Sequence, residues 1–432
     1  MQTKLKLAIL GGASTNTAEV FEYIIKHYDD LKFTEVVLID LKTSEERLDI
    51  MTNFIQRMLK HHNIPISVTS SLNQRHGLLD ADFVLIQIRV GHMQARFYDE
   101  TIPAEFNMLG HESIGIGGLF NALRTVPVIY EMIEDIKELA PKAWVINATN
   151  PTGIISEAVC RFSEFDRYIG LSNEPNQITK EVIDKLKAHP NELVPYYAGL
   201  SELSFMLKVY HKGKDKLPKL LSGGFLPKNH PMALENLQRL GCYPHPNLKY
   251  YYQDEVVTKT FLDNQKNKKI LTNQMIEFND LLYKKYADEN TLNVFKDMQK
   301  LLDHSFAQTA VEIMDSIKNN KKNYHVIHTV NHGHIVGIPD ETSIEITARM
   351  TKDGPIPVHI GELPLHVRGI VQHLKAYEEL LCDAIYEKDL NKALLAFQIH
   401  PLSKSFKSTK DAFNALYDKH KEYLTYYGVY NK

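Results

Sequence analysis

The chain has 432 residues, of which 44% are hydrophobic, so it can bury a large core. Its 50 basic and 53 acidic residues give a formal net charge of −3, which provides no basic field for a polyanion and excludes nucleic acid as an expected partner. Three widely separated cysteines (Cys160, Cys242 and Cys382) argue against a disulfide framework and a cysteine-rich zinc site, and they indicate a reducing compartment.

The first forty residues predict a strand, a tight turn, a helix and a second strand. An apolar strand covers 5–10, a helix covers about 16–28, and a second strand at 36–39 ends in Asp40; the turn between strand and helix is Gly11-Gly12-Ala13-Ser14. Such a turn lets backbone N–H groups approach a pyrophosphate at the helix N-terminus, while a carboxylate after the second strand accepts hydrogen bonds from a ribose. The segment therefore predicts a dinucleotide site. Asp40 favours NAD over NADP because it repels a 2′-phosphate.

The spacing of these glycines differs from G-x-G-x-x-G, which leaves a second interpretation open. In that interpretation the small residues of an ordinary strand–helix turn only allow close packing.

Strand and helix patterns then alternate to about residue 200, which predicts a parallel sheet covered by helices. We expect strands at 64–70, 83–88, 144–146, 168–170 and 196–198, and helices at 127–139 and 177–188. Beyond a strand at 205–210 the patterns are mainly helical, at 258–286, 291–302, 306–319, 365–386 and 390–397, with short β-like runs over 325–363. The predicted fold class is α/β: a Rossmann-like parallel-sheet domain over 1–200, then a mixed, mainly helical α+β domain over 201–432.

No low-complexity linker separates the two regions, so the second should close a cleft over the carboxyl ends of the strands. The sequence shows neither an apolar targeting segment at its start nor an apolar run of about 18 residues. We therefore expect a cytoplasmic protein without a membrane partner.

Polar residues gather in three segments that follow predicted strands or open helices. These are Arg89-Val-Gly-His-Met-Gln-Ala-Arg96, Leu109-Gly-His-Glu112-Ser-Ile-Gly-Ile-Gly-Gly118 and Asn147-Ala-Thr-Asn150-Pro151. Their order and content resemble glycoside hydrolase family 4, and most closely its 6-phospho-β-glucosidases. Further matches reach nearly the whole chain, at Gly170-Leu171, Gly199-Leu200, Tyr250-Tyr251, Ile338-Pro339-Asp340 with Glu345, and Lys375-Ala-Tyr-Glu-Glu-Leu380.

The resemblance implies tightly held NAD, a divalent metal such as manganese, a sugar or sugar phosphate as the small-molecule substrate, and a homodimer or homotetramer. The family is an exception to the usual two-carboxylate glycosidase scheme. Its reaction begins with hydride transfer from sugar C3 to NAD, which acidifies the proton on C2. A base removes this proton, the C1 substituent is eliminated, water adds, and the hydride returns.

The resemblance also assigns candidate residues. Candidates for cofactor binding are Gly11, Gly12, Ser14, Asp40, Arg89 and Asn150. Candidates for substrate binding are Arg89, Arg96, Glu112, Asn147, Asn150 and Asn173. The alternative role for the polar residues of the three segments is strand-end capping and local hydrogen bonding.

The metal ligands of the family are replaced in this chain. A Cys in G-L-C-N-x-P and a His in G-L-N-H-L correspond to Ser172 and Glu202. A neutral hydroxyl has neither the charge nor the softness of a thiolate, whereas a carboxylate still suits a hard cation. Manganese binding is therefore doubtful, with Ser172 and Glu202 as its candidate ligands and Asn173 beside them.

The base and one phosphate contact of the family are replaced as well. The first Tyr of P-x-x-Y-L-x-Y-Y corresponds to Asn247, whose amide cannot take a proton, so His245 or Tyr250 would have to act as the base. The family's R-G-G-x-x-Y stretch corresponds to 301–306, without the Arg. Glu174 stands where the family favours an apolar residue; its carboxylate either faces the cleft beside Glu202 or is a solvated loop charge. A replacement metal site from Asp303, His304 and Glu202 is a further alternative.

Three hypotheses follow. The first is an enzyme, a family 4-type glycosidase that acts on a phosphorylated or plain glycoside with NAD. The second is a catalytically degenerate member that serves as an NAD- and sugar-binding or regulatory protein. The third is an NAD-dependent sugar or hydroxy-acid dehydrogenase on the same scaffold.

Overall fold

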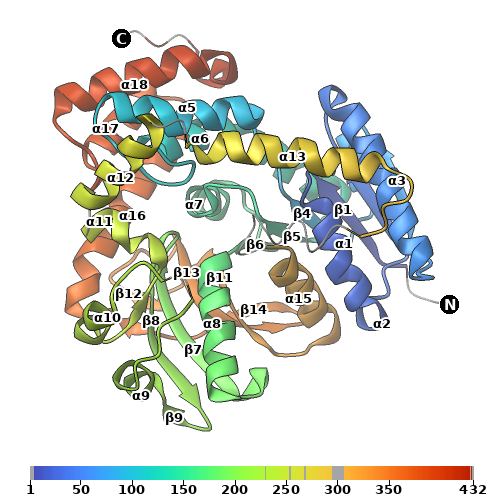
Figure 1. The fold of residues 1–432 in the computed structure, drawn as a ribbon, viewed down its shortest axis with the longest axis horizontal. Coiled ribbons are helices and arrows are strands. Elements are labelled where there is room, and N and C mark those ends of the chain that lie inside the picture. The colour runs from blue at the N-terminus through green and yellow to red at the C-terminus, as the bar shows by residue number, and fades with distance from the viewer. Residues whose placement is uncertain are drawn as a thin grey trace.

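A computed structural model describes residues 4–228, 230–252, 254–266, 269–293, 306–428 and 430. The predicted helix over 291–302, the stretch 301–306, and Asp303 and His304 fall wholly or mostly outside these ranges. A mixed 13-stranded sheet crosses the molecule, and helices cover both of its faces (Figure 1). Among the described residues, no helix combines the length and apolar character needed to span a membrane.

The parallel half of the sheet has the strand order β6-β5-β4-β1-β2-β3. Its strands are β1 (Lys6–Leu10), β2 (Glu35–Ile39), β3 (Ser67–Ser71), β4 (Phe83–Ile86), β5 (Trp144–Asn147) and β6 (Tyr168–Leu171). Leu10 pairs with both Ile39 and Ile86, so the carboxyl ends of the central strands lie at one edge. All residues of β1 are buried, and all except Lys6 are apolar, as expected for a strand covered on both faces.

The helices of this half follow the predicted alternation. They are α1 (Thr17–Lys26), α2 (Tyr28–Leu31), α3 (Glu45–His61), α4 (Gln74–Leu78), α5 (His92–Glu105), α6 (Gly115–Leu139), α7 (Thr152–Phe162) and α8 (Asn173–Leu186). The prediction of a helix starting at residue 127 is wrong, because α6 begins at Gly115. Its glycine-rich first turns pack against other backbone: a Cβ on Gly117 would lie 2.5 Å from the carbonyl oxygens of Asp99 and His111.

The second half of the sheet is antiparallel and continues directly from β6. In order after β6 come β11 (Tyr324–Val330), β13 (Ser343–Thr351), β7 (Leu193–Leu200), β8 (Leu203–His211) and β10 (Tyr243–Pro244). At the edges, β9 (Lys214–Asp215) pairs with β8 and β14 (Gly354–Pro357) with β13, while β12 (Ile335–Val336) and β15 (Gly361–Glu362) form a separate pair. Two strands from beyond residue 300 thus lie between β6 and β7, so the two predicted domains share one sheet. The division at residue 200 stays a prediction.

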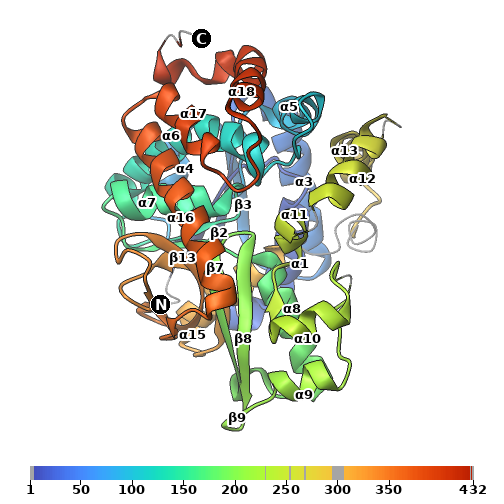
Figure 2. The same ribbon diagram turned by 90° about the vertical axis from the view of Figure 1, so that its left-hand side faces the viewer.

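The remaining helices pack around this sheet. They are α9 (Leu217–Ser222), α10 (Leu234–Leu240), α11 (Lys249–Tyr252), α12 (Asp254–Lys266), α13 (Leu271–Ala287), α15 (Phe306–Asn319), α16 (Leu365–Tyr386), α17 (Leu390–Gln398) and α18 (Phe406–His420). Figure 2 shows α16–α18 on one side of the molecule and α12 and α13 on the other. In Figure 1, α13 runs from α5 to α3, above the strands that carry the first turn.

Candidate active site

The turn after β1 is held tightly against the end of β2. Gly11 has a φ of +86°, which favours glycine, and a Cβ on Gly12 would lie 2.7 Å from the Cβ of Leu38. The N–H groups of both glycines donate to the Ile39 carbonyl at 2.9 Å. Close packing therefore requires these glycines, and it also brings the N-terminus of α1 beside the end of β2.

Asp40 joins the second strand to the turn. Its Oδ2 accepts a hydrogen bond from the Ala13 N–H at 2.9 Å, and its Oδ1 accepts one from the Leu41 N–H at 2.8 Å. Each carboxylate oxygen has a second lone pair that these bonds leave unused. Ser14 is partly exposed, and its hydroxyl accepts the Asn16 N–H at 3.3 Å.

Helix α13 covers one side of this turn. The Tyr283 hydroxyl donates to the Ala13 carbonyl, and the Tyr286 hydroxyl donates to the Thr15 carbonyl at 3.0 Å. At its start, α13 is anchored to α5, because the Thr272 hydroxyl donates to Glu100 at 2.6 Å. These contacts use carbonyl oxygens of the turn.

All three polar segments meet at Glu112. Its carboxylate accepts a hydrogen bond from Arg89 and lies 3.0 Å from Arg96 Nη1, while the Asn150 amide donates to it at 3.5 Å. Burial alone would raise the pKa of Glu112, but Arg89 and Arg96 outweigh burial and lower it well below its usual range. The side chain of Arg89 is 30% exposed, against 6% for Arg96, so Arg89 is the cation of this group that can reach a ligand.

Asn147 makes both of its described side-chain hydrogen bonds within its own turn. Its Oδ1 accepts the Thr149 N–H and its Nδ2 donates to the Thr149 carbonyl, each at 3.1 Å. The side chain is fully buried, which matches the capping alternative. Asn150, by contrast, is partly exposed and reaches Glu112.

Ser172 follows β6, near a buried His–Glu pair of the antiparallel strands. His328 Nε2 lies 3.2 Å from Glu345 Oε1, and both side chains are 2% exposed. Burial would raise the pKa of Glu345, but His328, with smaller contributions from His245 and Ser172, lowers it. Asn173 starts α8, next to Ser172.

Glu202 lies in the tight turn between β7 and β8, with a φ of +64°. Its Oε2 accepts a hydrogen bond from the Asn247 amide and lies 3.9 Å from His245 Nε2, which is also 3.5 Å from Glu174 Oε2. Burial raises the pKa of Glu202, and the neighbouring Glu174 adds to this rise. Of the two alternatives for Glu174, the structure places its carboxylate at this group.

His245 is fixed by its backbone surroundings. Its Nδ1 accepts the Asn247 N–H at 3.1 Å, and its own N–H donates to the Ser204 carbonyl at 2.7 Å. Burial lowers the pKa of His245, but Glu174 and Glu202 outweigh burial and raise it. The Asn247 N–H would lose its acceptor if Nδ1 were protonated, and this opposes part of the rise.

A small cavity has Glu202 among its lining residues. Pro151, Ser201, Tyr251, Tyr377, Glu378 and His400 are among the residues that line it. Carboxylate, hydroxyl and imidazole groups thus face one small space, a lining that suits a polyhydroxylated ligand. Tyr250 precedes Tyr251 in α11, and its ring packs against His111 with ring centroids 5.7 Å apart. Burial raises the pKa of Tyr250 to about 12.

No described hydrogen bond or ion pair joins Ser172 to Glu202, the expected pair of metal ligands. Both lie near Glu345, whose charge contributes to raising the pKa of Glu202, and the Glu202 carboxylate itself contacts Asn247 and His245. Glu202 already faces two groups that carry hydrogens, and the hydroxyl of Ser172 is neutral. This donor set does not fit a divalent cation in the manner of the family.

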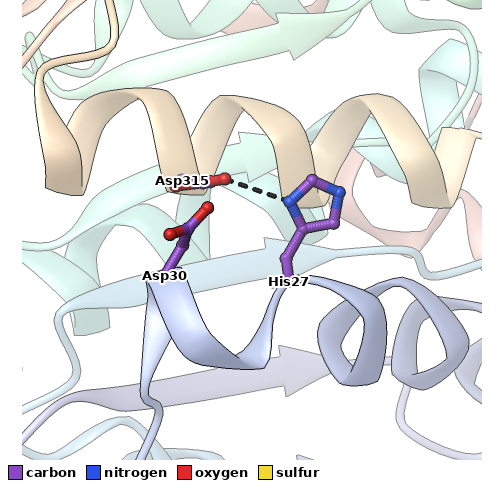
Figure 3. A group of neighbouring side chains, drawn as sticks. All are labelled: His27, Asp30 and Asp315. Carbon is purple, nitrogen blue, oxygen red and sulfur yellow. Dashed lines mark hydrogen bonds and ion pairs between the residues drawn. The ribbon is translucent and has the colours of Figure 1, made fainter.

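One group outside this region has the composition of a metal site. His27, Asp30 and Asp315 place potential ligand atoms within 4.8 Å of one another, and within the described ranges no other group of at least three His, Cys, Asp or Glu residues does so (Figure 3). The Lys321 ammonium group already lies 2.6 Å from Asp30 and 2.7 Å from Asp315. The lysine ammonium group therefore already bridges the two carboxylates, and we assign no metal here.

Sequence reasoning missed His328 as a residue of this region and used Glu345 and Glu378 only as parts of family matches. A charged residue within an apolar strand was the available signal, at His328 in Val-Ile-His-Thr-Val and at Glu345 in Ser-Ile-Glu-Ile-Thr. Glu378 carried no such signal, because helix α16 contains several carboxylates.

Comparison with known families accounts for the arrangement. Residues 6–188 match the model of family 4 glycosyl hydrolases, and residues 197–403 match the model of the family's C-terminal domain. The chain belongs to glycosyl hydrolase family 4. The predicted family and fold class are thereby confirmed.

Relatives in this family are similar over nearly their full length. A probable 6-phospho-β-glucosidase of Bacillus subtilis is 34% identical, with 98% of each chain covered. The 6-phospho-β-glucosidase of Escherichia coli is 31% identical, with 93% of this chain and 92% of the relative covered. The structure of the Thermotoga maritima 6-phospho-β-glucosidase with NAD and glucose 6-phosphate has a TM-score of 0.89 at 25% identity, and covers 97% of this chain and 99% of that chain. Another structure of that enzyme contains manganese as well.

Proposed function

We propose that this chain is an NAD-dependent glycosidase that hydrolyses 6-phosphorylated β-glucosides. The observation that carries the proposal is the turn of Gly11 and Gly12 closed by Asp40, in a family 4 chain that is 34% identical to a probable 6-phospho-β-glucosidase. The relative from Thermotoga maritima was solved with NAD and glucose 6-phosphate, which supports the same two ligands here.

The turn fits NAD through its backbone and Asp40. We place the pyrophosphate beside the N-terminus of α1, against the turn of Gly11 and Gly12, and Asp40 retains lone pairs for a ribose. Bound there, NAD supplies a hydride acceptor for a carbon of the sugar.

The sugar phosphate fits the space between Asn150 and Glu202. Arg89 has guanidinium hydrogens beyond the one that Glu112 accepts, and these suit a phosphate or sugar hydroxyl. Pro151 and Glu202 line the cavity, so a sugar in it would lie next to the Asn150 turn. Asn173 is at the start of α8, where its amide suits a sugar hydroxyl.

Glu202 is the base that we propose for the proton on C2. The Asn247 amide donates a hydrogen bond to the Glu202 carboxylate, which lies at the edge of the cavity. Burial favours the protonated form of Glu202. Tyr250 keeps its proton at neutral pH because its pKa is raised to about 12, and Asn247 has no proton-accepting group. His245 acts on the position of Glu202 and does not contact the sugar in this proposal.

A second candidate function is NAD and sugar binding without turnover. The observation that favours it is Asn247, which stands at the position of the family's proposed base and is already bonded to Glu202. It predicts the same ligands as the enzyme and differs only in the release of product.

The test is release of p-nitrophenol from p-nitrophenyl 6-phospho-β-glucoside in the presence of NAD. The enzyme proposal expects release that requires NAD and the 6-phosphate and no accumulation of NADH, whereas a dehydrogenase would accumulate it. Glu202→Gln should abolish release. Glu192→Gln is the control, because Glu192 directly precedes β7 whereas Glu202 follows it, and it should leave release unchanged. NAD binding without release favours the second candidate, and absence of NAD binding contradicts both.

The cellular location and the oligomeric state of the chain belong to the same proposal. We place it in the cytoplasm, which is supported by the three unpaired cysteine thiols, and we propose a homodimer or homotetramer on the basis of the family resemblance. Light scattering after size-exclusion chromatography tests the assembly.

A further inference from the structure

Three of the positions at which this chain departs from its family lie together in the structure. Glu202 replaces a metal-binding His, Asn247 replaces the proposed base, and Glu174 replaces an apolar residue. Asn247 donates to Glu202, while His245 lies 3.5 Å from Glu174 and 3.9 Å from Glu202. The changed residues thus belong to one connected group, which we call the Glu202 network: Glu174, Glu202, His245 and Asn247.

The direction of each hydrogen in this network follows from the backbone. Because His245 Nδ1 accepts the Asn247 N–H at 3.1 Å, the ring must carry its hydrogen on Nε2, and this atom faces both carboxylates. The Asn247 side chain presents its NH₂ group to Glu202. Two hydrogen donors therefore converge on the carboxylate.

Both donors reach the same oxygen of Glu202, Oε2. A divalent ion bound to this oxygen requires a lone pair directed toward it, whereas the N–H groups of His245 and Asn247 direct their positive ends toward it. The second ligand position is altered as well, because the neutral hydroxyl of Ser172 replaces a thiolate.

We infer that this chain works without the divalent metal of its family, and that the Glu202 network takes the place of the metal centre by holding the Glu202 carboxylate at the sugar cavity. The use of that carboxylate in catalysis rests on the proposed function. The absence of a metal site is a property of the folded chain and can be measured without turnover.

The experiment titrates manganese(II) into the full chain with NAD and glucose 6-phosphate present, using calorimetry for binding and EPR spectroscopy for the free ion. We expect no binding heat and an undiminished free-ion signal. Stoichiometric uptake that is lost in Glu202→Gln would overturn the inference.

A variant designed to gain manganese binding tests the inference from the opposite direction. Ser172→Cys/Glu202→His restores the family's ligand types and should deplete the free-ion signal, whereas Ser222→Cys/Glu235→His, on exposed positions of α9 and α10, should not. Equal binding in both double variants, or in neither, would overturn the assignment of these two positions. Circular dichroism checks folding.

Quenching of Trp144 or tyrosine fluorescence by NAD is followed in the same samples. Failure to bind NAD contradicts the proposed function whatever the metal result, so the two proposals fail separately.

Discussion

The Asp40 carboxylate accepts a hydrogen bond from the Ala13 N–H at 2.9 Å, and this bond ties the end of β2 to the nucleotide turn. Asp40→Asn keeps an acceptor for Ala13 but removes the negative charge that repels a 2′-phosphate. We expect the preference for NAD over NADP to fall by about tenfold, which corresponds to about 1.4 kcal/mol, as measured by fluorescence titration with both nucleotides. Asp82→Asn is the control, because Asp82 accepts the Lys6 N–H at the start of β1. An unchanged preference would show that Asp40 does not face the ribose.

The packing of Gly12 predicts a large effect from a single methyl group. Gly12→Ala would place Cβ 2.7 Å from Leu38 Cβ and 2.9 Å from the Ile39 nitrogen, and backbone cannot give way as a flexible side chain can. We expect a loss of roughly 2 kcal/mol in the free energy of unfolding, measured in urea. Gly369→Ala, on the exposed face of α16 with nothing within 4 Å, should instead stabilise by about 0.5 kcal/mol. Equal effects at the two positions would contradict this account.

The bond between Tyr283 and the Ala13 carbonyl predicts that α13 controls access to the turn. Tyr283→Phe removes the hydroxyl and should cost about 1 kcal/mol, or roughly fivefold in the equilibrium that holds α13 closed. NADH should then both bind and dissociate faster, as followed by stopped-flow fluorescence. Tyr243→Phe removes a similar bond, to the Phe225 carbonyl at 2.6 Å, away from the turn. It should lower stability without changing the NADH rates, and a change of rates in both variants would refute the role of α13.

The lowered pKa of Glu112 predicts loss of stability in acid. Between its folded pKa and the ordinary glutamate pKa of 4.5, the unfolded chain binds more protons than the folded chain, so stability falls as the pH falls. Glu112→Gln should cost about 3 kcal/mol at neutral pH because Arg89 and Arg96 lose a partner. Below about pH 4.5 the difference between wild type and variant should shrink. Urea unfolding at neutral pH and near pH 4 checks this, and a difference that does not change with pH would contradict it.

The sequence determined the fold class because the relevant signals are local. The alternation of apolar strands with helices, and the small residues between β1 and α1, specify a parallel sheet with a turn at its edge. The polar segments around Arg89 and Glu112 were found for the same reason, since the first follows a strand end and the second opens a helix. The start of α6 at Gly115 was not predicted, because a glycine-rich helix turn depends on the neighbouring backbone of Asp99 and His111.

Only the tertiary structure decided which of the candidate residues act together. His328 and Glu345 meet because β11 and β13 pair, and His245 reaches Glu174 and Glu202 across separate elements. In sequence these residues are tens to more than a hundred positions apart, so neither spacing nor residue type shows that the changes at Glu174, Glu202 and Asn247 belong to one network. Local periodicity fixes how each segment folds, whereas the contacts of a side chain are fixed by strand order, register and the exclusion of water from the core.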